Sequence, residues 1–206
     1  MTDPILERAA KNGIALEMRG AVALVTLRRP AKRNALSDML IEAIRDTFQN
    51  LPAEAKAAVI DGEGAHFCAG LDLSELKERD AGEGVHHSRG WHVALDAVQY
   101  GRVPVVAALH GAVVGGGLEL ASACHIRVAD ESTFYALPEG TRGIFVGGGG
   151  SVRVPKLIGV ARMTDMMLTG RVYNAVDGER VGFAQYLVPQ GTALEKALEL
   201  AERIAT

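Results

Sequence analysis

Short apolar runs alternate with amphipathic helical segments along most of the chain. Residues 14–27 fit two strands joined at Arg19-Gly20, and the second, Ala21–Leu27, is mostly apolar, which is typical of a strand buried on both faces. Further short strands are predicted at Ala57–Asp61, Val103–Leu109, Ile126–Ala129, Phe134–Ala136 and Gln185–Val188. Strands that alternate with helices in this way predict an α/β fold.

Helical periodicity begins after Ser37, a favourable N-cap residue. The apolar positions that follow it with the spacing of one helix face are Leu40, Ile41, Ile44, Phe48 and Leu51. A second helix is predicted at Leu118–Cys124, and a terminal helix carries one apolar stripe, formed by Leu194, Ala197, Leu198, Ala201 and Ile204. The segment Asp80–Gly90 is polar and rich in glycine, which predicts a mobile loop beside a ligand site.

Composition narrows the class of protein. The chain has 206 residues, of which 48% are hydrophobic and 23% charged, as expected for one globular domain with or without a small appendage. Its formal net charge is −3, which predicts no general attraction to nucleic acid or to an anionic membrane. Cys68 and Cys124 are too few for a disulfide framework, so we expect small core residues in a cytoplasmic protein. The longest apolar run, Val103–Leu109, is too short to cross a membrane, and no targeting segment is evident.

Two glycine clusters, Gly115–Gly117 and Gly147–Gly150, are candidates for a backbone binding site. Neither is followed by Lys-Ser or Lys-Thr, and no window fits G-x-G-x-x-G, so phosphate-loop and dinucleotide fingerprints are both excluded. A strand that ends in glycines and opens a helix can still aim free N–H groups at a ligand or at a developing oxyanion. Close packing between helix and strand explains the same spacing and is the simpler interpretation.

Two carboxylates lie near these clusters. Glu119 falls in the first turn after Gly115–Gly117, among apolar neighbours, and Glu139 follows a short predicted strand. A buried carboxylate can serve as a general acid or base, although an acid that complements the helix dipole or faces solvent is the commoner case. The scattered histidines form no metal-ligand spacing, so no metal site is predicted. No G-x-S-x-G motif supports a serine nucleophile.

Four segments taken together resemble the crotonase family, the enoyl-CoA hydratase/isomerase superfamily. They are residues 29–36 (RPAKRNAL), 67–73 (FCAGLDL), 110–120 (HGAVVGGGLEL) and 138–143 (PEGTRG) with the glycine run that follows. The resemblance spans essentially the whole chain and implies a spiral of ββα repeats with a shortened C-terminal helical region. Residues 1–190 would form the spiral core, and 191–206 would begin the helical region.

The resemblance also assigns roles. Glu119 and Glu139 match the two hydratase glutamates, with Glu119 activating water and Glu139 exchanging the proton at the α carbon. The backbone N–H groups of Leu71 and Gly116 match an oxyanion hole for the thioester carbonyl, and that of Gly147 matches a position that helps to hold the water. The positions that match CoA contacts are Lys32, Arg33, Ala69, Gly70, Asp72 and Leu73. No separate cofactor is implied, because coenzyme A enters as part of the acyl-CoA thioester substrate.

These matches imply a hydratase that adds water across the α,β double bond of an enoyl-CoA in fatty acid metabolism. A homotrimer or hexamer is expected, with no nucleic-acid or membrane partner. Two alternatives stay open: a Δ3-Δ2-enoyl-CoA isomerase or another crotonase-type reaction, and a non-catalytic CoA-binding or scaffold protein. The segment Glu75–Trp91 matches the region that shapes the acyl pocket, so the acyl group is not specified.

The chain departs from the family pattern at a few positions. Val146 replaces a common proline, His125 replaces a common aspartate, and Arg142 and Phe145 are unusual neighbours of Glu139. The chain also stops at Thr206, where relatives continue into further helices. We therefore expect a modified acyl pocket and apolar surface that another element must cover.

Overall fold

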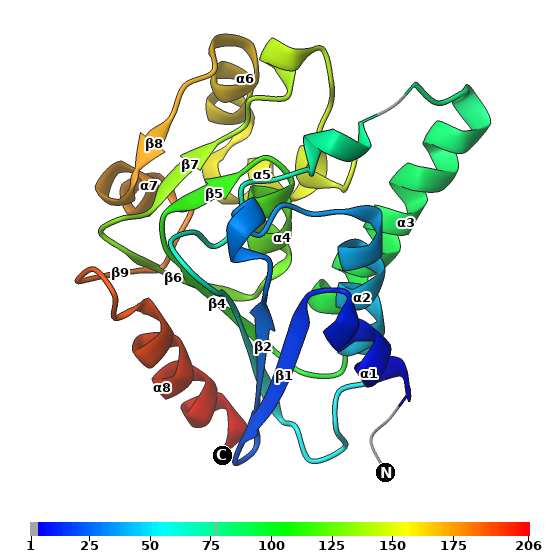
Figure 1. The fold of residues 1–206 in the computed structure, drawn as a ribbon. Helices are drawn as coiled ribbons and strands as arrows, with labels where there is room; N and C mark the ends of the chain where they lie inside the picture. The colour runs from blue at the N-terminus through cyan, green and yellow to red at the C-terminus, as the bar shows by residue number, and fades with distance from the viewer. Residues whose placement is uncertain (1–3, 77) are drawn as a thin grey trace.

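The computed structural model describes residues 4–76 and 78–206, and its strands and helices alternate along the chain as predicted (Figure 1). In this part of the chain the largest sheet has the strand order β1-β2-β3-β4-β6-β9. Its members are β1 (Ile14–Arg19), β2 (Val22–Leu27), β3 (Ala57–Gly62), β4 (Val105–Leu109), β6 (Ile126–Asp130) and β9 (Tyr186–Val188). The β1–β2 hairpin is antiparallel, and every later neighbour pairs in parallel.

A second, smaller sheet stands beside the first. It joins β5 (Ala112–Val114), β7 (Phe134–Ala136) and β8 (Tyr173–Asn174), and single bridges extend it from Cys68 to Val113 and from Leu36 to Leu71. Successive passes of the chain cross the large sheet, then the small sheet, and then enter a helix. This arrangement confirms the predicted spiral of ββα units. The sequence analysis missed β5 and β8: β5 follows β4 almost directly along the chain, and the two residues of β8 are too few to show a periodicity.

Helices cover both faces of the large sheet (Figure 1). On one face lie α1 (Pro4–Lys11), α2 (Asp38–Gln49), α3 (Ala81–Gln99) and α4 (Gly116–Ala123), and on the other lies α8 (Ala193–Ala205). Between β7 and α8 the chain forms α5 (Gly150–Ile158), α6 (Val160–Thr169) and α7 (Ala175–Val181). Ser37 caps α2 as predicted, its hydroxyl accepting a hydrogen bond of 3.2 Å from Leu40 N–H.

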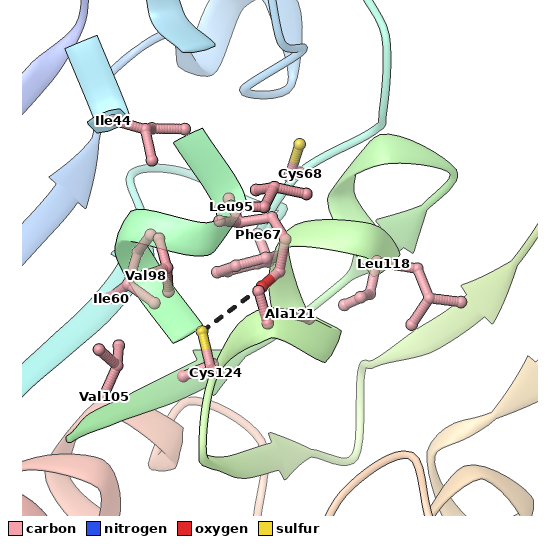
Figure 2. Close-up of a cluster of buried hydrophobic side chains, with 14 of the residues drawn as sticks. Ile44, Ile60, Phe67, Cys68, Leu95, Val98, Val105, Leu118, Ala121 and Cys124 are labelled. Carbon is pink, nitrogen blue, oxygen red and sulfur yellow. Dashed lines mark hydrogen bonds between the residues drawn. The ribbon is translucent and has the colours of Figure 1, made fainter. Parts of the chain in front are cut away.

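Alternate residues of each central strand enter two different cores. In β3, Ala58 and Ile60 face α2, α3 and α4, whereas Ala57 and Val59 face α8. Both faces are buried, which explains why this strand is an unbroken apolar run. Cys68 and Cys124 lie free among the apolar side chains of the first core (Figure 2), which confirms them as core residues. Burial raises the pKa of each thiol to about 12.

The predicted stripe of the terminal helix is correct only in part. Ala197 and Ala201 are buried against the sheet, but Ile204 is 37% exposed. Leu200 and Ala205, which lay outside the predicted stripe, are buried instead. The contact face of α8 therefore consists of four alanines and Leu200, with Leu194 and Leu198 at its margin.

The prediction of a mobile loop at Asp80–Gly90 is wrong. Residues from Ala81 onward form α3, and Asp80 caps it by accepting a hydrogen bond of 2.8 Å from Glu83 N–H. The Glu83 carboxylate returns a bond to Asp80 N–H, which completes a capping box. Packing of Trp91, Ala94, Leu95 and Val98 in the core then outweighs the low helix propensity of the three glycines among the first ten residues of α3. No helix in the described residues is long and apolar enough to cross a membrane.

Candidate active site

The junction between β5 and α4 presents backbone donors to an open space. Gly115 precedes the helix with φ of +53°, a left-handed conformation that suits glycine, and α4 begins at Gly116. The N–H of Gly116 belongs to the first turn, where no carbonyl of the helix can accept it. Among the described residues no other group accepts it either.

A second backbone donor lies on the neighbouring segment. Leu36 N–H donates to Gly70 O (2.7 Å) and Leu36 O accepts from Asp72 N–H (2.9 Å), so the N–H of Leu71 between them points away from Leu36. Gly70 has φ of +93°, and a Cβ built on it would lie 2.8 Å from Val114 O and 3.4 Å from Gly116 N. Glycine at this position therefore lets the segment that carries Leu71 approach the start of α4. The two predicted oxyanion positions lie on adjacent segments.

Glu119 occupies the first turn of α4 and is only 3% exposed. Its Oε1 accepts hydrogen bonds from Gly148 N–H (3.0 Å) and Gly150 N–H (2.7 Å). Burial raises the pKa of this carboxyl above its usual range, while the two N–H donors and the nearby Arg153 act in the opposite direction. One carboxylate oxygen is thus fixed by the backbone, and the other remains available.

The glycine run 147–150 is shaped to hold Glu119. A Cβ on Gly150 would lie 2.7 Å from Glu119 Cγ, and one on Gly148 would lie 3.3 Å from Glu119 Oε1. Arg153, in the first half of α5, ties down the same turn by donating to Gly148 O (2.9 Å) and to the side chain of Gln99 (2.7 Å). The resemblance assigns Gly147 of this run to the water, and the N–H groups that hold the glutamate, which the sequence analysis did not identify, belong to Gly148 and Gly150.

Glu139 reaches the same space from the other side. It precedes the short 3-10 helix η3 (Gly140–Arg142) and is 7% exposed. Its Oε2 is buried without a hydrogen-bond partner among the described residues. Burial raises the pKa of this carboxyl to about 7, a backbone hydrogen bond opposes that rise, and the negative charge of Glu119 adds to it. A carboxyl with this pKa can both give and accept a proton near neutral pH.

Both glutamates line one cavity of about 180 Å³. Gly116, Leu71 and Gly147 border it as well, so the predicted acid–base pair, the oxyanion positions and the predicted water-holding position meet in one place. Its remaining wall consists of apolar side chains with Arg79, His87 and Ser88 from the region of α3. Ser88 also donates to Gly147 O (2.7 Å), which links α3 to the glycine run.

A larger cleft of about 450 Å³ opens from this cavity. All six residues predicted to contact CoA line it: Lys32, Arg33, Ala69, Gly70, Asp72 and Leu73. The cleft and the cavity share Leu71, Glu139 and Ile144. The two spaces therefore form one continuous site, with a cationic loop at one end and paired carboxylates at the other.

Asp72 has a structural role in this cleft. Its carboxylate accepts hydrogen bonds from Arg29 (2.9 Å) and from the hydroxyl (2.6 Å) and N–H (3.2 Å) of Ser74. These partners lower the pKa of Asp72 to about 2 despite the cost of burial. Asp72 also caps the short 3-10 helix η2 (Leu73–Glu75), so it braces the wall of the cleft.

Lys32 and Arg33 present the positive charge of the cleft. Both are exposed, and they occupy the end of the short 3-10 helix η1 (Pro30–Lys32) and the left-handed turn that follows. The buried side chain of Asn34 fixes this turn by donating to the carbonyls of Glu63 (3.0 Å) and His66 (2.8 Å). Exposed cations on a fixed loop suit phosphate groups.

The four residues that depart from the family pattern lie in different parts of the structure. Phe145 lines the cavity, whereas Arg142 lines the larger cleft and opposes the rise in the pKa of Glu139. Val146 is buried, and His125 uses its Nδ1 to accept a hydrogen bond of 3.0 Å from Val105 N–H. Arg153 was missed, because a lone arginine in a helix carries no signal for the distant carbonyl that it contacts.

Comparisons with known proteins agree with this arrangement. A family model described as enoyl-CoA hydratase/isomerase matches residues 17–206. The enoyl-CoA hydratase EchA19 of Mycobacterium tuberculosis is 34% identical over 196 residues, which cover 92% of this chain and 73% of that protein. The fatty acid oxidation complex subunit alpha of Shewanella amazonensis is 36% identical over 87% of this chain, which covers 26% of its length.

A solved structure has the same fold. The crystal structure of a protein from Rhodopseudomonas palustris, provisionally named enoyl-CoA hydratase, is 61% identical and superposes with a TM-score of 0.92. The match covers 94% of this chain and 75% of that one. The spiral of ββα units described above is therefore a known architecture.

Proposed function

Because the chain belongs to the enoyl-CoA hydratase/isomerase family, we propose that it adds water across the α,β double bond of an enoyl-CoA thioester. The similarity to a fatty acid oxidation complex subunit supports a role of this reaction in fatty acid oxidation. The observation that carries the proposal is the pair of buried glutamates in one cavity, beside two backbone N–H groups that have no acceptor within the described part of the chain. Hydration needs one group to take a proton from water and another to give a proton to the α carbon, and isomerisation needs only one such carboxylate.

In the proposed mechanism the thioester carbonyl lies against the N–H groups of Leu71 and Gly116. These donors are fixed before the substrate binds, and the start of α4 adds the positive end of its dipole. As electrons move from the double bond toward the carbonyl, the enolate oxygen gains negative charge that both donors stabilise. Loss of one such donor typically costs about 3 kcal/mol of transition-state stabilisation.

Proton transfer is divided between the glutamates. Glu119, whose Oε1 is held by two N–H donors, takes a proton from water through its other oxygen while the water oxygen bonds to the β carbon. Glu139, protonated near neutral pH, gives its proton to the α carbon as the enolate collapses. The product is a 3-hydroxyacyl-CoA, and one proton passes from Glu119 back to Glu139 through solvent to restore the pair.

The cleft supplies recognition of the carrier. Lys32 and Arg33 would meet the phosphates of CoA, and the segment from Ala69 to Leu73 would lie along the pantetheine arm. Coenzyme A then enters and leaves as part of substrate and product, and the steps above use only side chains and backbone of this chain.

The test is an assay of the purified chain with crotonyl-CoA, followed by loss of the ultraviolet absorbance of the conjugated thioester. We expect 3-hydroxybutyryl-CoA as product, with kcat reduced about 100- to 10,000-fold in both Glu119→Gln and Glu139→Gln. Each variant keeps an oxygen and nearly the same shape, so binding of butyryl-CoA measured by calorimetry should persist and control for folding.

Other outcomes would contradict the proposal in distinct ways. Interconversion of unsaturated thioesters that depends strongly on only one glutamate, without formation of a hydroxyl product, would indicate an isomerase. Binding of CoA thioesters without turnover of short, long or aromatic enoyl-CoAs would indicate a binding or scaffold protein.

We also propose self-association into a homotrimer or hexamer in the cytoplasm. Large apolar side chains are exposed on α5, α6 and the segment that follows, namely Val152, Val160, Leu168, Val172 and Val176. Such a surface favours burial against another copy. Sedimentation analysis would test it, and a monomer at micromolar concentration would contradict it. The two unpaired, buried cysteines support the reducing location.

A further inference from the structure

The acyl side of the cavity has an unexpected wall. Most of it is apolar, formed by Leu71, Leu76, Trp91, Ile144 and Phe145. Arg79 and His87 interrupt this wall, and neither of them lines the larger cleft proposed for CoA. Beyond them a wider groove of about 590 Å³ runs between α2 and α3, and both residues line that groove as well. A cationic group therefore stands where the acyl chain of a thioester would end.

The guanidinium of Arg79 is poorly satisfied. Its side chain is only 16% exposed, and in the described part of the chain its one polar contact is a hydrogen bond of 3.4 Å to Asp38 Oδ2. Buried charged groups are normally well hydrogen-bonded, and arginine has five N–H donors in a planar fork. Most of these donors are left for another acceptor.

Asp38 does not neutralise Arg79 fully. The same carboxylate uses its Oδ1 for a shorter contact of 2.7 Å with His87 Nε2, and it is half-exposed to solvent. Its backbone N–H donates to Glu75 (2.8 Å), which turns that carboxylate toward the start of α2. The acids that line the cavity itself, Glu119 and Glu139, make no ion pair with Arg79 among the described residues.

We propose that the acyl groups of the preferred substrates end in a carboxylate and that Arg79 binds this carboxylate, with His87 as a second contact. The inference rests on the proposed hydration of enoyl-CoA thioesters and specifies their class. A planar carboxylate matches the guanidinium fork with two parallel hydrogen bonds, whereas a methyl end would bury the same donors without partners. The apolar wall accommodates the carbons between the thioester and the acid.

Matched substrate pairs provide the test. Hydration of crotonyl-CoA is compared with that of glutaconyl-CoA, which carries a carboxylate on the same enoyl unit, and hexenoyl-CoA is compared with hexenedioyl-CoA. We expect kcat/KM to favour the acid of at least one pair by about tenfold or more. The ratio within a pair cancels any effect on the shared CoA and thioester contacts.

Variants of Arg79 then assign the preference. Arg79→Met should reduce the ratio about tenfold or more, and Arg79→Lys should retain part of it, because lysine keeps the charge and loses the fork. Arg89→Met is the matched control: Arg89 is exposed on α3, the helix that Arg79 precedes, and lines neither the cavity nor the groove, so both rates should stay unchanged. If Arg79→Met does not fold, the wild-type ratio and Arg79→Lys decide the question.

A preference for the methyl end in both pairs, or a ratio that Arg79→Met leaves unchanged, would overturn the inference while the hydratase proposal stands. If no enoyl-CoA is hydrated, calorimetry with the unreactive thioesters glutaryl-CoA and butyryl-CoA separates the two proposals. Tighter binding of glutaryl-CoA that Arg79→Met abolishes would support the carboxylate site alone, and equal binding would refute it.

Discussion

The two carboxylates of the site are buried to a similar degree but are held in different ways. On the α4 side, the backbone of a glycine run donates two hydrogen bonds to one oxygen of Glu119. On the η3 side, Glu139 packs against Gly115 and, among the described residues, keeps one buried oxygen without a partner. Burial raises the pKa of both groups, and hydrogen bonding distinguishes them. The pair thus divides into a fixed acceptor and a proton carrier, as the proposed hydration requires.

Gly115→Ala should have the largest effect on activity, because it displaces Glu139. The new Cβ would clash with Glu139 Oε1, and the substitution would force alanine into a left-handed backbone next to Gly116, whose N–H is the proposed oxyanion donor. The glutamate can swing away at small cost to folding, but its proton would then miss the α carbon. We expect kcat for crotonyl-CoA to fall on the order of a thousandfold, because a displaced acid and a displaced donor act together.

Gly20→Ala is the control for that variant. Gly20 has φ of +59° in the β1–β2 hairpin, and a Cβ added there would meet nothing within 4 Å. Gly20→Ala should lower the free energy of unfolding by about 1 kcal/mol through backbone strain, and kcat should stay unchanged. If Gly115→Ala behaved like Gly20→Ala, Glu139 would not need its present position.

Gly150→Ala tests in the same way whether the position of Glu119 matters for catalysis. Its Cβ would meet Glu119 Cγ at 2.7 Å, while its backbone is not left-handed, so the clash acts without added strain. A shift of the carboxylate by about 1 Å should lower kcat about 100-fold. The two N–H donors would also separate from Oε1, so the variant should lose stability. A variant that lost stability but kept its kcat would show that these bonds serve folding alone.

The raised pKa of Glu139 predicts a pH-dependent cost to folding. Its pKa is about 7 in the folded chain against an ordinary value of 4.5, so the folded state binds the proton more tightly. Stability contributed by the protonated form is complete below pH 4.5 and is lost as pH rises to about 7. The full loss is at most about 3 kcal/mol.

Glu139→Gln should therefore be more stable than the wild type at about pH 8 by up to about 3 kcal/mol, with little difference near pH 4.5. Denaturant unfolding at both pH values would measure the difference. We expect a smaller gain for Glu119→Gln, because two N–H donors already offset the cost of burying that charge. Equal gains in both variants would remove the distinction between the two carboxylates.

The sequence predicted the CoA side of the site better than the acyl side, for a physical reason. The positions in the cleft belong to short segments whose turns are fixed locally, such as the left-handed glycine at Gly70 and the turn at Arg33 and Asn34. The resemblance could carry these positions over one by one, and the structure places all six around one cleft.

The acyl side depends on contacts between segments far apart in sequence. Arg153 reaches Gln99 across 54 positions and Asp38 reaches His87 across 49, and no local pattern announces either pair. The start of α3 was a different kind of error, because its signal was present. Asp80 and Glu83 have capping-box spacing, whereas the glycines within and after this spacing favour a loop by composition alone.

The smallest predicted effect concerns that helix. Gly84 lies in the first half of α3, and a Cβ added there would meet nothing within 4 Å, so Gly84→Ala removes a helix-weakening residue without a clash. We expect a gain of about 0.5–1 kcal/mol in the free energy of unfolding. Ser88 and Trp91 of the same helix line the cavity, so any opening of α3 would also alter the cavity. If α3 stays formed throughout turnover, Gly84→Ala should change kcat less than about twofold. A large change in kcat would mean that the start of α3 must open during turnover.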